Sequence, residues 1–214
     1  MPIDDDSMKR IRRRQAAFDR RVKAIRADPN LSAHGKRRAM AVERHAAVTD
    51  IENIKAAAAQ AYTARKQELE RRMFGVHDHK GDVSALVSYR DAQDRVAEIK
   101  NGAEAQLMMR RAIRNGDTLL ARALFDRGWE QSGDRIMGSG WGEVVKAYVA
   151  DVRPDLAESV NELGHLQHIG ADRTRRLTDA METGVHMPPE MEGMSTYDQQ
   201  RAATEAADTE GVPQ

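Results

Sequence analysis

The sequence predicts an all-α protein, and three observations lead to that fold class. Alanine and arginine dominate the 214 residues, with 32 and 26 copies, and both are strong helix formers. Apolar residues recur at steps of three and four, which is the period of a helix with one buried side. No stretch of five or more residues alternates apolar and polar side chains between turn signals, so we expect no sheet.

The N-terminal residues predict an amphipathic helix that ends before Pro29. Its apolar stripe consists of Met8, Ile11, Phe18, Val22 and Ile25. Ser7 is the expected N-cap, and the three aspartates before it suit the positive end of a helix dipole. The helix should end at Asp28, because a residue that precedes proline avoids the α conformation.

A second, very long helix is expected from Ser32, its N-cap, to Phe74, because no proline interrupts this range. About 40 residues at 1.5 Å each give a rod of roughly 60 Å. Its seam has coiled-coil spacing but is rich in alanine, so it buries little area: Ala47, Ile51, Ile54, Ala58, Ala61, Leu69 and Met73. Residues 1–74 therefore predict a long antiparallel helical hairpin, in which the first helix covers only part of the second.

The rest of the chain predicts shorter elements. Residues 75–83 form a linker, and residues 84–186 form a bundle of short helical hairpins, similar in style to an α-solenoid. Asn115-Gly116-Asp117 marks a turn between two of these helices. No 34-residue period repeats, which argues against a true repeat array. Residues 187–214 are acidic, contain two adjacent prolines and lack an apolar period, so we expect a mostly disordered tail.

The zero net charge conceals a strong division along the chain. Residues 1–74 carry a net charge of +8, residues 75–178 carry −1, and residues 179–214 carry −7. A cluster of arginines and lysines on the first two helices could bind nucleic acid through its phosphates, without sequence preference. The same cluster could instead dock on an acidic protein surface or on the chain's own acidic tail. We expect no membrane partner, because apolar runs of spanning length and aromatic interfacial anchors are missing.

Candidate chemistry is sparse in this sequence. The chain has no cysteine, which excludes disulfides, thiolate metal sites and cysteine nucleophiles. Two histidine pairs, His77 with His79 and His165 with His168, lack the third ligand that a zinc site needs. The glycine-rich stretch 137–142 follows no strand and lacks the residues of a phosphate-binding loop. We therefore expect no catalytic residue, metal or cofactor, and a protein that is not an enzyme.

We assign the candidate binding residues to two sets. The first should mediate helical association with another copy or a partner protein: Ile51, Ile54, Leu69 and Met73. The second should provide electrostatic docking, with nucleic-acid binding as the alternative use of the same side chains: Arg12, Arg13, Arg14, Arg37 and Arg38.

Three stretches, together with the Asp28-Pro-Asn-Leu-Ser turn, resemble a family of small all-helical proteins. They are Arg90-Asp-Ala-Gln-Asp-Arg-Val-Ala, Arg111-Ala-Ile-Arg-Asn-Gly-Asp-Thr-Leu-Leu-Ala-Arg-Ala and Gly140-Trp-Gly-Glu-Val-Val-Lys-Ala-Tyr. This family is encoded among the virion genes of tailed phages and prophages of high-GC Gram-positive bacteria. The resemblance implies a structural or capsid-assembly role as a head, scaffold-like or connector-associated protein. It also implies an oligomer or a head or connector partner, and a location in the virion or the host cytoplasm.

Overall fold

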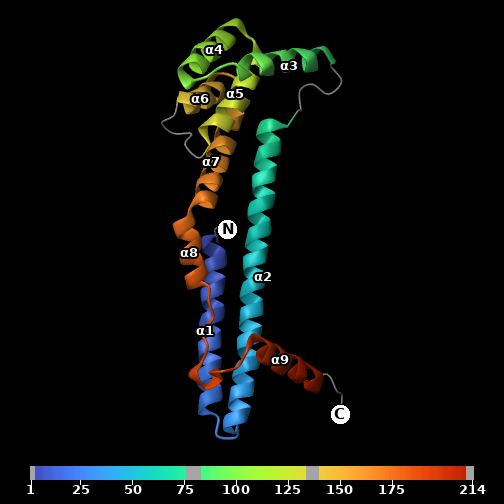
Figure 1. The fold of residues 1–214 in the computed structure, drawn as a ribbon, viewed down its shortest axis with the longest axis vertical. Helices are drawn as coiled ribbons and strands as arrows, with labels where there is room; N and C mark the ends of the chain where they lie inside the picture. The colour runs from blue at the N-terminus through green and yellow to red at the C-terminus, as the bar shows by residue number, and fades with distance from the viewer. Residues whose placement is uncertain (1–2, 76–82, 134–139, 211–214) are drawn as a thin grey trace. The chain divides into compact units, whose positions relative to one another are not determined.

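The computed structural model describes residues 3–75, 83–133 and 140–210 (Figure 1). These residues are helical and contain no strand, which confirms the all-α fold class. The chain divides into two compact units. Unit 1 comprises Met1–Tyr62 and Asp172–Gln214, and unit 2 comprises Thr63–Ala171. The domain boundaries predicted at residues 74 and 186 therefore differ from those of the structure.

Helix α1 (Asp5–Ala27) begins earlier than the sequence predicts, because Asp4 rather than Ser7 is its N-cap. The Ser7 backbone N–H donates to Asp4 Oδ1 at 2.9 Å, and the Ser7 hydroxyl donates to Asp4 Oδ2 at 2.7 Å. Ser7 is thus a buried partner of the cap. The helix ends before Asp28, as the following proline predicts.

Helix α2 (Ala33–Phe74) is continuous over 42 residues, and its first part forms an antiparallel hairpin with α1 in unit 1 (Figure 1). Phe18, Val22 and Ile25 of α1 share one apolar core with Met40, Ala41 and Ala47 of α2. Ile11 and Ile51 meet in a neighbouring core with Ile3. The predicted hairpin is confirmed, and the apolar stripe of α1 lies on its inner side.

The C-terminal residues of unit 1 fold against this hairpin and correct the prediction of a disordered tail at 187–214. The structure has α8 (Arg173–Glu182), the short 3₁₀ helix η2 (Pro189–Met191) and α9 (Thr196–Glu210). Met191 is fully buried in the core with Phe18 and Met40, and Ala202 joins the same core. Single apolar anchors and polar contacts hold this segment, and for that reason its sequence shows no apolar period. Residues 211–214 lie outside the described residues.

Unit 2 contains short helices that pack around one apolar core. In order they are α3 (Val83–Ala97), α4 (Gly102–Asn115), α5 (Thr118–Ser132), α6 (Gly140–Asp151), η1 (Pro154–Leu156) and α7 (Ala157–Ala171). The core includes Met109, Leu124, Phe125 and Leu163, together with Leu69 and Met73 from the end of α2. The end of α2 belongs to this unit because its large side chains complete the core. Residues 76–82 of the predicted linker lie outside the described residues, and the likeness to a solenoid stays a prediction.

Two glycines determine how the helices of unit 2 connect and pack: Gly116 lies in a turn, and Gly102 lies where two helix ends approach closely. Gly116 has φ of +68° at the turn that the sequence predicts after α4, and Asp117 then caps α5 by accepting the Leu120 N–H at 3.0 Å. At the start of α4, Gly102 faces the start of α6. A Cβ added to Gly102 would lie 2.6 Å from the backbone nitrogen of Trp141 and 2.7 Å from Gly140 Cα. Only glycine allows these two helix ends to approach so closely.

We predict that Gly102→Ala destabilises unit 2. The added methyl group meets backbone atoms, which cannot rotate away as a side chain would, so the free energy of unfolding should fall by about 1–3 kcal/mol. Urea denaturation followed by circular dichroism measures this change. Gly184→Ala is the control, because its nearest atom lies 3.7 Å away. Equal stability of the Gly102 variant and the native chain would contradict the close approach.

Candidate binding surfaces

The apolar residues predicted for association lie inside the chain's own units. Ile51 packs with Ile11 in unit 1, and Ile54 is partly buried against the same core. Leu69 and Met73 are 2% and 0% exposed in the core of unit 2. These four side chains therefore pack within the chain, because α1 covers the first pair and the short helices of unit 2 cover the second, and their role in association stays a prediction.

The predicted docking arginines are divided between paired and unpaired positions. Arg14 lies in the hairpin, where its guanidinium donates to Glu43 at 3.0 Å and to Asp50 at 2.7 Å. Arg12 pairs with Glu182 at 2.8 Å, and Arg38 pairs with Glu205 at 3.1 Å. Arg37 donates to the backbone carbonyl of Glu192 at 2.9 Å. Arg13 is exposed and forms no ion pair with the described residues.

Residues 179–205, which we call the C-terminal clasp, make most of these contacts. At one end, Asp179 accepts the Ile3 N–H at 3.1 Å. Gln15 then donates to the carbonyls of Glu182 and Gly184, both at 2.8 Å. Arg44 of α2 donates to the carbonyls of Val185 and His186 and to the side-chain oxygen of Gln199. The clasp is thus bound through its carboxylates and carbonyl oxygens, with Met191 as its apolar anchor.

Arg26 and Glu190 form a bidentate ion pair between α1 and the clasp. Arg26 Nε and Nη2 donate to the two carboxylate oxygens of Glu190 at 2.5 and 3.0 Å. These hydrogen bonds are the main reason that the pKa of Glu190 falls from its ordinary 4.5 to about 2. Glu190 is therefore fully ionised near neutral pH.

A second group of cations on α1 makes no such contacts. We call it the outer row, and its six members are exposed and form no ion pair with the described part of the chain: Lys9, Arg10, Arg13, Arg20, Arg21 and Lys23. Lys9, Arg13 and Arg20 lie on the side of the helix opposite the buried Ile11 and Phe18, and the other three flank them. Within this stretch the only acidic residue is Asp19, which lies 3.5 Å from His186 of the clasp.

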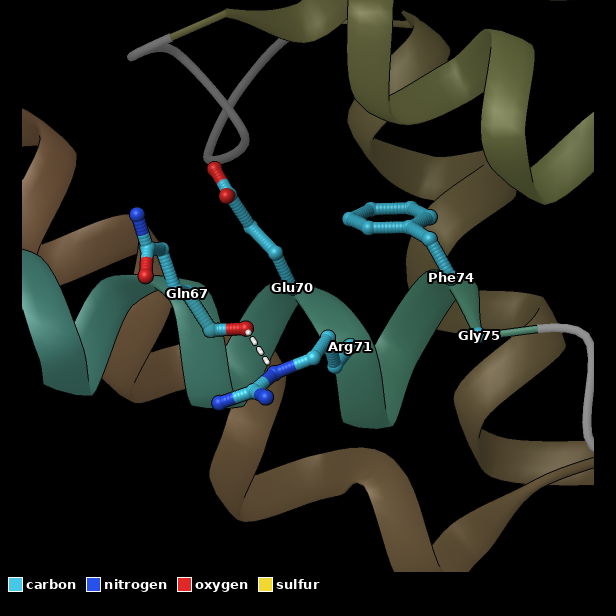
Figure 2. Close-up of a pocket in the computed structure, with 5 residues that line it drawn as sticks. All are labelled: Gln67, Glu70, Arg71, Phe74 and Gly75. Atoms are coloured by element: carbon cyan, nitrogen blue, oxygen red, sulfur yellow. Dashed lines mark hydrogen bonds between the residues drawn. The ribbon is translucent and has the colours of Figure 1, made fainter.

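Two pockets lined by residues that the structure describes border α2. One, of about 350 Å³, lies between α2 and α9 and is lined by His34, Arg37, Arg38, Asp198, Arg201 and Glu205. Its charges largely satisfy one another, since Glu205 contacts both Arg38 and Arg201. Figure 2 shows the other, of about 410 Å³ at the end of α2, with Arg71 turned back to the carbonyl of Gln67 at 3.3 Å.

Unit 2 holds a partly buried polar cluster that the sequence analysis did not predict. The Tyr89 hydroxyl of α3 donates to Asp126 of α5, and Arg122 Nε lies 3.1 Å from Asp126 Oδ1. The Arg122 guanidinium also lies 5.8 Å from the centre of the Phe125 ring. Burial raises the pKa of both Asp126 and Tyr89. The i, i+4 spacing of Arg122 and Asp126 in an apolar helix was the available signal, and the cluster ties α3 to α5.

Helix α8 exposes apolar side chains in an unusual arrangement. Leu177 and Met181, one helical turn apart, are 68% and 85% exposed. The same helix contacts the rest of unit 1 through polar groups, because Asp179 and Arg175 bind the backbone of Ile3. Exposed apolar side chains at this spacing are typical of a protein contact.

Metal ligands, membrane spans and known relatives add no further site. The described residues hold no group of three or more metal-ligating side chains placed to share an ion. His165 and His168 are exposed on α7, while His77, His79 and residues 137–139 of the glycine-rich stretch lie outside the described residues. Among the helices that the structure describes, none is long and apolar enough to cross a membrane.

No family model, curated protein or solved structure matches this chain.

We predict that Glu190 titrates near pH 2 in the native chain and near 4.5 in Arg26→Ala, as measured by carboxyl-carbon NMR. Because the folded-state pKa is lowered, the pair stabilises the clasp above about pH 4.5, and that stabilisation is lost as the pH falls through about 2. Arg20→Ala, which removes an unpaired arginine from the same helix, should leave the midpoint unchanged. A native midpoint near 4.5 would show that the pair does not form.

Proposed function

We propose that this chain is a non-enzymatic binding protein that recognises a polyanion, namely nucleic acid, through the outer row of α1. The observation that supports this proposal is the set of six exposed lysines and arginines without an ionic partner in the described residues. The other arginines of α1, Arg12, Arg14 and Arg26, are matched with acidic groups, so the outer row is the part of α1 whose charge has no acidic partner in the described residues.

The dimensions of the outer row fit a phosphate backbone. Lys9 and Lys23 are 14 residues apart, which corresponds to about 21 Å along a helix. Duplex DNA carries one charge per roughly 1.7 Å of its axis, so several phosphates come within reach of six cations. Contacts of this kind go to phosphates and not to bases, and we therefore expect binding without sequence preference. Up to six contacts give a slope of about −5 for log K against log salt.

We predict that Arg10→Ala/Arg13→Ala/Arg20→Ala weakens binding of a duplex DNA oligonucleotide. Loss of three phosphate contacts should reduce the salt slope by about 2.7 and weaken binding about tenfold or more at physiological salt. Fluorescence anisotropy over a salt series measures both quantities. The matched control, Arg90→Ala/Lys100→Ala/Arg176→Ala, removes the same charge from three other exposed cations. Equal loss in both variants, or no binding by the native chain, would refute the proposal.

A structural or assembly role through helical protein contacts is the second candidate. The exposed Leu177 and Met181 on α8 favour it, because they offer an apolar strip to a second helix. The resemblance described above implies a phage setting, in which the partner would be another copy or a head or connector protein. This role does not conflict with nucleic-acid binding, since the strip and the outer row lie on different helices.

If a second copy covers the α8 strip, we expect self-association at tens of micromolar protein. Leu177→Gln/Met181→Gln should abolish it while leaving the melting temperature unchanged, because both side chains are largely exposed. Size-exclusion chromatography with light scattering measures the mass. Leu86→Gln/Val87→Gln, which changes two exposed apolar residues of α3, is the control. A native chain that remains a monomer, and that captures no head or connector protein, would argue against the assembly role.

A further inference from the structure

The C-terminal clasp brings a strongly acidic segment onto the basic hairpin. Residues 179–214 carry a net charge of −7, and residues 1–74 carry +8. Three carboxylates of the segment each form an ion pair with one arginine of the hairpin. The pairs are Glu182 with Arg12, Glu190 with Arg26, and Glu205 with Arg38. Without these pairs, the hairpin would present three further cations without an acidic partner, in addition to the six of the outer row.

The clasp contacts the hairpin in the way a phosphate backbone would. Its oxygens accept from guanidinium groups, both as carboxylates and as the backbone carbonyls that bind Arg37 and Arg44. Charge-assisted bonds to oxygen are also the contacts that arginine makes with phosphate. The acidic segment therefore stands in the place that part of a bound polyanion would take.

The clasp is held by exposed ion pairs and by one buried apolar side chain, and these contacts differ in strength. The Arg12 and Glu182 side chains are 64% and 44% exposed, and those of Arg38 and Glu205 are 44% and 43% exposed. Exposed pairs of this kind are weak and sensitive to salt. Met191, in contrast, is fully buried. A competing polyanion can consequently displace the carboxylates while the methionine anchor keeps the segment attached.

We propose that the clasp is an internal competitor of the nucleic acid, which limits binding by occupying Arg12, Arg26 and Arg38. This inference rests on the proposed function of the outer row and specifies how that same surface is regulated. Arg12 lies beside Lys9 and Arg13 on α1, so its release extends the outer row directly. Release of Arg26 lengthens the basic surface toward the end of the helix.

The test compares duplex DNA binding by the native chain and by Glu182→Gln/Glu190→Gln/Glu205→Gln. Neutral glutamines preserve the shape of the clasp but release three arginines of the hairpin, and Arg201 of α9 also loses its pair with Glu205. From the three hairpin arginines we expect binding at least about fivefold tighter at physiological salt and a slope steeper by up to about 2.7. The control, Glu98→Gln/Glu104→Gln/Glu158→Gln, changes net charge equally at glutamates whose side chains pair with no described residue. Glu182→Gln alone, at an exposed pair, should give a smaller gain without risk to folding.

The outcomes separate the two proposals. Native binding that depends on the outer row, with no gain in the clasp variants beyond that of the control, overturns the competitor role and leaves the proposed function standing. Absence of DNA binding by every variant overturns both. A gain confined to the clasp variants, with Glu182→Gln intermediate, supports the competitor role.

Discussion

The docking of the C-terminal segment on the N-terminal hairpin is the constraint on which unit 1 depends. The apolar core of the hairpin is small, and Met191 and Ala202 of the C-terminal segment are needed to complete it around Phe18 and Met40. Polar contacts of Gln15 and Arg44 with clasp carbonyls set the path of the segment that delivers this methionine. Hydrogen bonds thus position the segment, and burial of the methionine side chain, which contributes about 1.5–3 kcal/mol, holds it in place.

Helix α2 serves two cores in succession. Up to residue 62 it contributes Met40, Ala47 and Ile51 to unit 1, and from residue 63 it contributes Leu69 and Met73 to unit 2. One continuous helix therefore takes part in two hydrophobic clusters, each completed by different segments of the chain. The great length of the helix follows from this double role.

The sequence could predict local structure well and long-range pairing poorly. The stripe from Ile11 to Ile25, the stop at Pro29 and the turn at Gly116 follow from local rules, and the structure has all three. The contacts of residues 172–210 could not be predicted, because a single anchor such as Met191 leaves no periodic signal. The charge division did suggest docking of the tail as one option, but no rule pairs Arg26 with Glu190 across 164 residues. The exposed pair on α8 was missed because periodicity indicates an apolar face without telling which side is covered.

The difference between the clasp surface and the outer row favours a nucleic acid over an acidic protein as the occupant of the row. The acidic clasp binds this hairpin through two kinds of contact. Irregularly spaced arginines donate to its backbone carbonyls, and an apolar site of the hairpin buries Met191. The outer row offers no comparable site, since the side chains between its cations are small alanines such as Ala16 and Ala24, both exposed. A protein partner would gain little from burial there. A phosphate backbone needs no such site, because released counterions supply most of its binding free energy.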